Sequence, residues 1–494
     1  MANVLEESVS AASRPISNFI AGEWVAAAGA DSLGNFDPAT GEHLGQTPLS
    51  NRSDVEAAVQ AACDAFPEWR STPVVERARV LFRLKALLEQ EREELARSLT
   101  REQGKTVPES AGEIQRGIEN VEHACGMPSL MMGETLEDIA KGIDCQTVRQ
   151  PLGVFAAITP YNFPVMIPLW FWPYAVASGN TFVLKPSEQD PLTHQRIVEL
   201  ARQAGLPAGV LNVVHGGPEA VEAILEHPEV KGISFVGSSQ VAAAVYARAA
   251  ASGKRVQALG GAKNHIIVLP DADLDQAAEA IGASVFGAAG QRCLAGSVVV
   301  GVEGAYKPLR QGILDFASAI RMGYGLEPDV DMGPVISGPH KQRVCNYIDQ
   351  GVSQGGSLLQ DGRGAQVERF PKGHWVGPTV FSDVDPRSAL GSQEVFGPVA
   401  AVTQAASLGE ALDLLQLSRY GNAASIFTRS GRAAREFRYR AGISMIGVNI
   451  GVAGPMAFFP FGGSRGSFYG DLKAQGRDAI EFYTDKRVVI SRWS

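Results

Sequence analysis

One cysteine of this 494-residue chain stands in a setting suited to covalent catalysis. Cys293 lies in Phe286-Gly-Ala-Ala-Gly-Gln-Arg-Cys-Leu-Ala-Gly296, directly after Arg292. Small residues let a backbone pass close to a ligand, and the fixed charge of an arginine favours the nucleophilic thiolate over the thiol. Cys293 is therefore the predicted nucleophile. The remaining cysteines lack such neighbours and are interpreted as structural: Cys63, Cys125, Cys145 and Cys345.

Polar side chains that could assist a cysteine follow apolar, strand-like runs. Asn162 lies in Ile158-Thr-Pro-Tyr-Asn-Phe-Pro164, and its amide could donate to an oxyanion beside the backbone N–H of Cys293. Lys185 ends the run Thr181–Leu184, at the edge where open parallel sheets bind ligands. Both have plainer interpretations, because asparagine often satisfies turn backbone and a lone Lys-Pro is often an ordinary strand end.

Two further segments carry weaker signals. Ser234-Phe-Val-Gly-Ser-Ser239 predicts a strand running into a helix, whose first N–H groups could hold a pyrophosphate. The segment has no GxGxxG pattern. Gln393-Glu-Val-Phe-Gly-Pro398 carries a glutamate in a turn, which without further information is a solvated side chain.

These segments are positioned by alternating strands and helices. From Leu152, apolar runs alternate with amphipathic stretches, which predicts βαβ units and a parallel sheet. A second series begins near His265–Leu269 and ends at about Met445. The predicted strands of the first series are Val154–Ile158, Thr181–Leu184, Val210–Val214, Gly232–Val236 and Arg255–Leu259. The predicted helices are Val165–Ala177, Leu192–Gln203, Glu219–Glu226, Gln240–Ala251, Ala277–Ala288, Tyr306–Ile320, Lys341–Gln354 and Leu408–Ser418.

The ends of the chain follow other patterns. Residues 1–15 are predicted to be a flexible lead, followed by short strands over 18–25 and 35–41. Apolar residues at steps of three and four predict helices over 53–103 and 108–125. The segment 138–149 is expected to be extended. Residues 479–494 are expected to form a strand.

Composition limits the possible functions. The chain has 45% hydrophobic and 20% charged residues, typical of a globular protein, and a net charge of −9. This charge argues against general nucleic-acid binding. Five scattered cysteines do not form a disulfide framework, and no signal peptide or membrane helix is expected. A cytoplasmic location is predicted.

Gly-Gln-Arg-Cys293, together with the Asn-Phe-Pro, Lys-Pro-Ser-Glu and Glu-Val-Phe-Gly-Pro segments, resembles the aldehyde dehydrogenase superfamily. The resemblance extends from about Ile16 to the C-terminus. It implies an α/β fold with a Rossmann-like cofactor domain (1–133 and 152–263), a catalytic α/β domain (264–470) and a small β oligomerisation flap (134–151 and 479–494). It also implies a homotetramer or homodimer.

The resemblance assigns roles by position. Cys293 and Asn162 would be catalytic, with Asn162 in the oxyanion hole. Lys185 and Glu188 would hold the adenosine ribose, and Glu188 would repel a 2′-phosphate, which favours NAD over NADP. Glu394 would bind the nicotinamide ribose. The complete set of expected cofactor-binding residues is Thr159, Tyr161, Lys185, Glu188, Gln189, Gly237, Ser238, Glu394 and Phe396. No metal is expected. Ala242 replaces a usual glycine near this site.

Two features indicate the CoA-acylating semialdehyde branch. Where hydrolytic members carry Glu-Leu-Gly-Gly, this chain reads Gln257-Ala-Leu-Gly-Gly261, and Ala258 is expected to replace the general base. Arg116, in a segment that resembles this branch, and Arg292 would bind a substrate carboxylate, which suits guanidinium groups. The resemblance implies oxidation of methylmalonate or malonate semialdehyde, with CoA as cosubstrate.

Two alternatives stay open at this point. The chain could be a hydrolytic aldehyde dehydrogenase that uses another base and yields a free acid. It could also be a catalytically silent structural member, although the presence of Cys293, Lys185 and Glu394 argues against this.

Overall fold

An eight-stranded sheet is formed mainly by the first α/β series. The structure is a computed structural model that describes residues 15–493. The strand order of this sheet is β19-β11-β10-β7-β8-β9-β1-β2. The central strands are parallel. They are β7 (Val154–Ile158), β8 (Thr181–Lys185), β9 (Leu211–Val213), β10 (Val230–Val236) and β11 (Arg255–Leu259). The antiparallel edge strands are β1 (Asn18–Ile20), β2 (Glu23–Val25) and β19 (Phe468–Gly470). The connections diverge at β7 and β10, which is where such sheets bind ligands.

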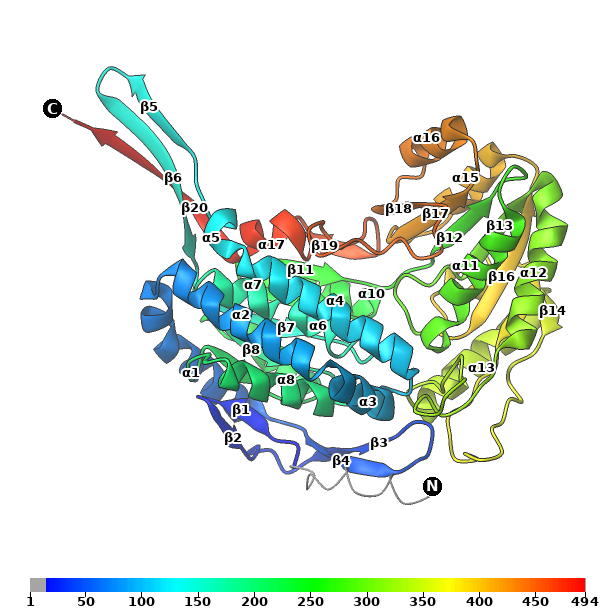
Figure 1. Ribbon diagram of the computed structural model, residues 1–494, viewed down its shortest axis with the longest axis horizontal. Helices are drawn as coiled ribbons and strands as arrows, with labels where there is room; N and C mark the ends of the chain where they lie inside the picture. Colours follow the sequence, from blue (N-terminus) through cyan, green and yellow to red (C-terminus); the bar gives the residue numbers. More distant parts are fainter. Residues whose placement is uncertain (1–14, 494) are drawn as a thin grey trace.

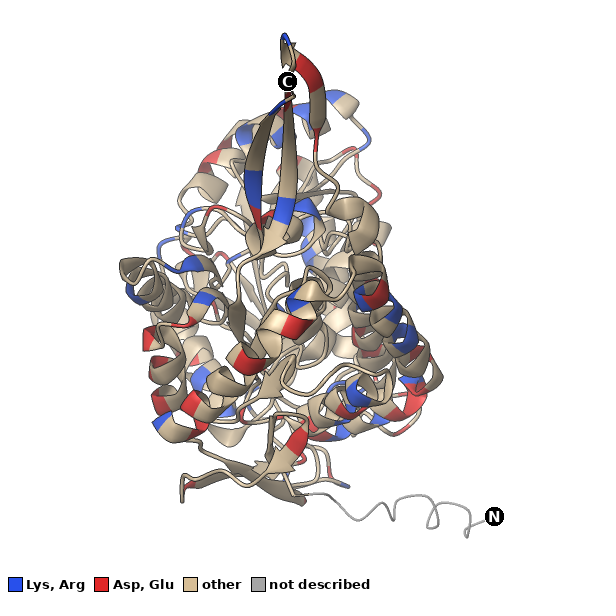
Figure 2. Cartoon of the chain, turned by 90° about the vertical axis from the view of Figure 1, so that its left-hand side faces the viewer, with Lys and Arg blue, Asp and Glu red and all other residues tan. Residues whose placement is uncertain are grey.

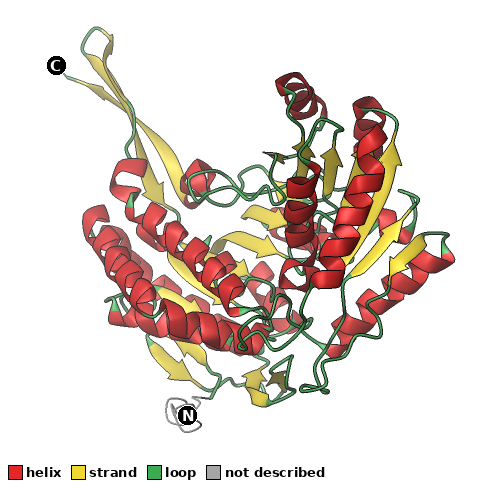
Figure 3. Ribbon diagram, turned by 45° about the vertical axis from the view of Figure 1, so that its right-hand side comes forward, coloured by secondary structure: helices red, strands yellow, loops and turns green. Residues whose placement is uncertain are grey.

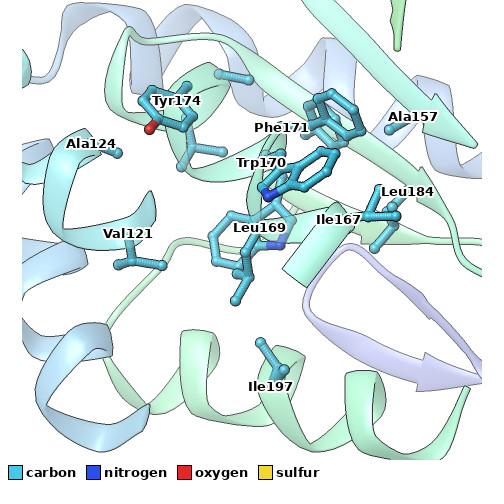
Figure 4. Packing of buried hydrophobic residues seen from close by; sticks show 14 of the residues in the cluster. Val121, Ala124, Ala157, Ile167, Leu169, Trp170, Phe171, Tyr174, Leu184 and Ile197 are labelled. Atoms are coloured by element: carbon cyan, nitrogen blue, oxygen red, sulfur yellow. The ribbon is translucent and has the colours of Figure 1, made fainter. Parts of the chain in front are cut away.

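Both faces of this sheet are covered by helices (Figure 1). Side chains of β7 alternate, so that Ala156 packs on the side of α1, α9 and α10, whereas Ala157 packs on the opposite side. Figure 4 shows the opposite side, where Ala157 and Leu184 lie with Ile197 and Phe171. The helices of the first side are α1 (Arg52–Ser71), α9 (Pro218–Glu226) and α10 (Ser239–Ala251). Those of the other side are α2 (Val74–Gln90), α3 (Arg92–Gln103), α4 (Val107–Cys125), α5 (Met127–Leu130), α6 (Met166–Leu169), α7 (Trp172–Ala177) and α8 (Leu192–Gln203).

The predicted helix Val165–Ala177 is wrong as a single element. It is divided into α6 and α7, with Trp170 and Phe171 between them. Pro173 lies in the first turn of α7, where its missing N–H costs nothing. The buried apolar side chains of both pieces explain why the stretch reads as one helix.

The second α/β series forms a seven-stranded sheet in the order β14-β15-β16-β13-β12-β17-β18. All neighbours are parallel except β14 and β15. The strands are β12 (His265–Val268), β13 (Val298–Val302), β14 (Ser357–Gln360), β15 (Thr379–Ser382), β16 (Val399–Ala405), β17 (Ala423–Phe427) and β18 (Met445–Val448). The helices are α11 (Leu274–Phe286), η1 (Gly287–Gly290), η2 (Glu303–Ala305), α12 (Tyr306–Ala319), α13 (Gly338–Ser353), α14 (Ala389–Ser392), α15 (Leu408–Gln416) and α16 (Gly431–Arg440). Figure 3 shows helices flanking both sheets.

A three-stranded flap projects away from the body (Figure 1). It consists of β5 (Thr135–Ala140), β6 (Ile143–Pro151) and β20 (Thr484–Arg492), in the order β20-β6-β5. β20 pairs with β6 along its whole length, as the family resemblance implied. The expected strand over 479–494 is wrong at its start, because α17 (Gly476–Tyr483) precedes β20. Ala479, Ile480 and Tyr483 are buried at helical spacing.

The remaining features are smaller. A hairpin of β3 (Ser32–Phe36) and β4 (His43–Pro48) lies near the N-terminus. The predicted flexible lead falls almost wholly on residues 1–14, outside the described part of the chain. Acidic and basic residues are interspersed along the chain in the view of Figure 2. Within residues 15–493, no helix is both long and apolar enough to cross a membrane. The predicted domain boundaries stay predictions.

Candidate active site

A cleft of about 580 Å³ opens at the carboxyl ends of β7, β8 and β10 and reaches the sulfur-bearing residue Cys293. All the residues expected to contact a cofactor line this cleft: Thr159, Tyr161, Lys185, Glu188, Gln189, Gly237, Ser238, Glu394 and Phe396. Asn162 also lines it. The structure thus brings together residues from both α/β series at one place.

A second cavity of about 330 Å³ approaches Cys293 from the side of α4. Arg116 and Arg292 both line it, together with apolar side chains that include Phe163 and Phe461. Cys293 contributes to both cavities. The cysteine therefore lies at their junction, with the larger cleft on one side and an arginine-containing pocket on the other.

The loop before Cys293 has an unusual backbone. Ala288 and Ala289 have φ values of 50° and 51°, in the left-handed region that non-glycine residues rarely adopt. After the cysteine, two amide side chains fix the chain, because Asn264 and Asn422 each donate to the carbonyl oxygen of Cys293 at 2.9 Å. Strained backbone held by specific contacts is common at functional sites.

The expected effect of Arg292 on Cys293 is present, but other effects outweigh it. Burial raises the pKa of the Cys293 thiol well above its ordinary value, and the negative charge of Glu394 raises it further. Arg292 lowers this pKa, with a smaller effect than either, and its guanidinium group also pairs with Glu109, with Nη2 2.9 Å from Oε1. The thiol is therefore protonated at neutral pH in the protein alone.

Asn162 lies against the cysteine loop. Its Nδ2 donates to the carbonyl oxygen of Gln291 at 3.1 Å, two residues before the sulfur. The side chain thus satisfies backbone, as the plainer interpretation expects, and it also lines the cleft beside Cys293. An amide has a second N–H, so this contact is compatible with donation to an oxyanion.

A buried ion pair that positions Asn162 was missed in the sequence. Lys105 Nζ lies 2.5 Å from Glu113 Oε2, and both side chains are almost fully buried. Lys105 also donates to the carbonyl oxygen of Asn162 at 2.8 Å. Glu113 accepts from the backbone N–H groups of Val165 and Met166 at the start of α6. These contacts span more than fifty residues, so no local pattern predicts them.

Lys185 and Glu188 form a compact unit at the end of β8. Lys185 Nζ donates to Glu188 Oε2 at 3.0 Å, to the carbonyl oxygen of Gly216 at 2.7 Å and to that of Pro186 at 2.9 Å. Lys185 is buried, whereas Glu188 is half-exposed in the cleft. The carboxylate therefore presents its charge to any ligand that occupies this part of the cleft.

The start of α10 faces the same cleft. Ser238 caps the helix by accepting from Val241 N–H, and Gly237 precedes it. Ala242, which stands where a glycine is usual, is fully buried against the sheet and does not line the cleft. Its methyl group therefore leaves the ligand-facing side of the helix start unchanged.

Glu394 and Phe396 approach the cysteine from the second α/β series. Glu394 Oε1 accepts from Ala262 N–H at 2.9 Å, and burial raises the pKa of Glu394 to about 7. Phe396 has a φ of 61° and its ring lies 6.0 Å from that of Tyr161. A bulky residue in the left-handed region again indicates a backbone constrained for function.

Ala258 lies close to the end of β11 and carries no carboxylate. It is fully buried, in a cluster with Ile158 and Phe235, which line the cleft. Because side chains alternate along β11, Leu259 points to the opposite face and belongs to the other core cluster of this sheet. Neither side chain lines the two cavities themselves, and the expected replacement of a general base by Ala258 stays a prediction.

Metal ligands are a separate question. Within residues 15–493 no group of three or more His, Cys, Asp or Glu side chains is arranged to hold a metal ion.

The chain belongs to the aldehyde dehydrogenase family, which it matches over residues 24–489. It is 51% identical to malonate-semialdehyde dehydrogenase 2 of Geobacillus thermodenitrificans over 97% of this chain and 99% of the relative. It is 49% identical to the malonate-semialdehyde dehydrogenase of Halalkalibacterium halodurans, over 97% and 98%.

Solved structures agree with this. The methylmalonate-semialdehyde dehydrogenase of Oceanimonas doudoroffii superposes with a TM-score of 0.95 at 45% identity, over 97% of this chain and 98% of the other. A protein of Sinorhizobium meliloti 1021, assigned as a methylmalonate-semialdehyde dehydrogenase and complexed with NAD, gives 0.96 at 44%, with the same coverage. The predicted fold is confirmed.

Proposed function

We propose that this protein is an NAD-dependent, CoA-acylating dehydrogenase of malonate or methylmalonate semialdehyde, which releases CO2 and forms acetyl-CoA or propionyl-CoA. The position of Cys293 between the cofactor-type cleft and the pocket of Arg116 and Arg292 carries this proposal. The names of the similar proteins support the same substrate class.

Two features of the cleft fit NAD: a buried polar atom without a partner, and a position where a side chain larger than that of glycine would collide with Glu394. Thr159 Oγ1 is buried without a hydrogen-bond partner and lines the cleft. A Cβ on Gly261 would lie 2.3 Å from Glu394 Oε2, so glycine is needed where that carboxylate reaches the ligand. Lys185, Glu188 and Glu394 would hold the two ribose groups, and the start of α10 would hold the pyrophosphate. NAD, when bound, supplies the acceptor for a hydride.

The oxidation step uses Cys293 and its neighbours. The sulfur attacks the aldehyde carbon after losing its proton, and the carbonyl oxygen becomes an oxyanion. Asn162 Nδ2 and the backbone N–H of Cys293 would donate to it. Loss of a hydride from the same carbon leaves a thioester on Cys293. Since the thiol pKa is raised in the protein alone, binding must favour the thiolate.

The second half-reaction transfers the acyl group. The substrate carboxylate, beside Arg116 and Arg292, is β to the thioester carbonyl. Its C–C bond can break to release CO2, and the electron pair forms a thioester enolate that takes up a proton. The CoA thiol then attacks the thioester carbon, which gives acyl-CoA and returns the proton to Cys293.

The direct test is product analysis with both semialdehydes, with and without CoA. We expect acyl-CoA and CO2 in amounts equal to the NADH formed. A free acid as the main product would instead identify a hydrolytic enzyme, and no NADH with any aldehyde would identify a silent member of the family.

We further propose that the flap joins subunits into a homodimer or homotetramer. Its exposed apolar side chains are unusual for a free surface. They are Leu136, Ile139, Val488, Ile490 and Trp493.

NAD should be preferred to NADP. A 2′-phosphate on the adenosine ribose would meet the half-exposed Glu188 carboxylate, and like charges at close range oppose binding. We expect kcat/KM to favour NAD by at least about tenfold, or about 1.4 kcal/mol. Glu188→Gln should narrow this ratio. Equal use of both cofactors by the wild type would show that Glu188 does not face the ribose.

Arg116→Leu should reduce kcat/KM for a carboxylated semialdehyde. Arg116 Nη1 lies 3.2 Å from Glu119 Oε2 and 2.9 Å from Met456 Sδ, and the side chain is 40% exposed. Because the pair is not fully desolvated, we expect the low end of the range for lost charge pairs, about 2 kcal/mol or about 30-fold.

Two comparisons make this test specific. Propanal, which lacks a carboxylate, should lose much less with the same variant. Arg92→Leu, which removes an arginine from the surface near Gln115, should leave both aldehydes unaffected. A similar loss for both aldehydes in Arg116→Leu would assign the residue a structural role.

A further inference from the structure

Glu109, at the start of α4, makes contacts in two directions. Its Oε2 accepts from the backbone N–H of Thr106 at 3.0 Å and from Thr106 Oγ1 at 3.1 Å, which closes the helix start. Its Oε1 accepts from Ala288 N–H at 2.6 Å and from Arg292 Nη2 at 2.9 Å. A capping glutamate usually serves its own helix, but this one also binds a loop 179 residues away.

We infer that Glu109 is a positioning residue that fixes the cysteine loop, and with it Arg292, to the helix that carries Arg116. This inference rests on the proposed function. Glu109 accepts a hydrogen bond from the backbone N–H of Ala288, the first of the two left-handed alanines before Cys293. Such a backbone persists only where its surroundings hold it.

Arg292 is held on its other side by the end of α11. Its Nη1 lies 3.4 Å from the carbonyl oxygen of Ala283, and a Cβ on Gly287 would lie 2.4 Å from the same nitrogen. The guanidinium group thus lies between Glu109 and the α11 terminus. Its side chain is 22% exposed, compared with 40% for Arg116. The two arginines are therefore not equivalent: Arg292 is held between a carboxylate and a backbone carbonyl, whereas the more exposed Arg116 contacts the side chains of Glu119 and Met456.

The length of the Glu109 side chain matters as well as its charge. As a carboxylate it only accepts hydrogen bonds, and here four donors surround its two oxygens. Glutamine would turn an NH2 group towards two of these donors in either orientation. Aspartate would keep the charge at the helix start, but it is one methylene shorter and cannot reach both Thr106 and Ala288.

The test compares Glu109→Gln, Glu109→Asp and, as the matched control, Glu122→Gln, which alters an exposed glutamate of the same helix that lines neither cavity. The first measurement is hydrogen exchange of the peptide covering residues 287–293. The second is the rate constant of the NADH burst with propanal and with a carboxylated semialdehyde. The burst amplitude counts competent sites, so a merely structural loss would lower the amplitude and leave the rate constant unchanged.

We expect faster exchange and a burst rate constant at least tenfold lower for both aldehydes in Glu109→Gln and Glu109→Asp. Glu122→Gln should keep wild-type exchange and wild-type rates with both aldehydes. Wild-type hydrogen exchange and burst rate constants in Glu109→Gln would overturn the inference. The same wild-type values in Glu109→Asp would also overturn it. A wild type without any burst would refute the proposed function instead, and the exchange measurement would still test the loop contact.

Discussion

Cys293→Ala is expected to abolish NADH formation from aldehydes, with a loss on the order of 10⁴-fold or more, because removal of a covalent nucleophile disables the chemical step. Without the sulfur, no bond to the aldehyde carbon forms, and the oxyanion from which the hydride departs is not made. NAD should still bind, because the Lys185, Glu188 and Glu394 side of the cleft is unaltered. Steady-state rates and a binding titration by quenching of protein fluorescence measure the two effects separately.

The matched control is Cys345→Ala. Cys345 is a half-buried cysteine of α13 that lines neither cavity, and its removal should leave turnover within about twofold. Substantial residual turnover in Cys293→Ala would place the nucleophile elsewhere, and equal losses in both variants would point to a general effect on folding.

Periodic elements of this fold could be predicted accurately from the sequence. The strands Val154–Ile158 and Arg255–Leu259 and the helix Leu192–Gln203 have the predicted bounds. The two strands are buried on both faces and are recognised as short, mainly apolar runs, whereas the buried side chains of the helix recur at helical spacing. The α6–α7 break and the start of β20 could not be predicted in this way, because apolar residues there satisfy more than one period.

The candidate site was predictable where motifs identify residue types, but the interactions of those residues were not. Arg292 is adjacent to Cys293 in sequence, yet its charge turns to Glu109. Ala258 and Leu259 are also neighbours, and the alternation of a strand directs them to opposite faces and into different buried clusters. Lys105, Glu109 and Glu113 act on segments more than fifty residues away, and such contacts leave no trace in local spacing.

The second large expected effect is a dependence of turnover on CoA. Ala258 and Leu259, the last residues of β11, carry no carboxylate, so this strand offers water no base. General-base assistance is worth about 10²–10⁴-fold, and hydrolysis of the Cys293 thioester should be slow without it. A thiol, once ionised, attacks a thioester far more readily than water does.

Rapid mixing with NAD and a semialdehyde should therefore give a burst of NADH of up to one equivalent per site, followed by a slow steady rate. CoA should raise the steady rate by at least about tenfold, because attack by water lacks base assistance of about 10²–10⁴-fold. CoA should leave the burst rate unchanged. Fast turnover without CoA would contradict this assignment. Glu394, whose pKa is raised to about 7, would then be the first base to examine.

A pair of substitutions tests the geometric origin of this effect. Ala258→Glu should place a carboxylate at the end of β11, on the side where Ile158 and Phe235 line the cofactor cleft, and raise the steady rate without CoA, with free acid as the added product. Leu259→Glu should direct the same group to the opposite face of the strand and into a buried core cluster, where an unpaired charge lowers stability and cannot assist water. Thermal unfolding and product analysis distinguish the two results. Because the variants differ by one position along one strand, a gain in hydrolysis from Leu259→Glu alone would show that the side chains face the opposite way.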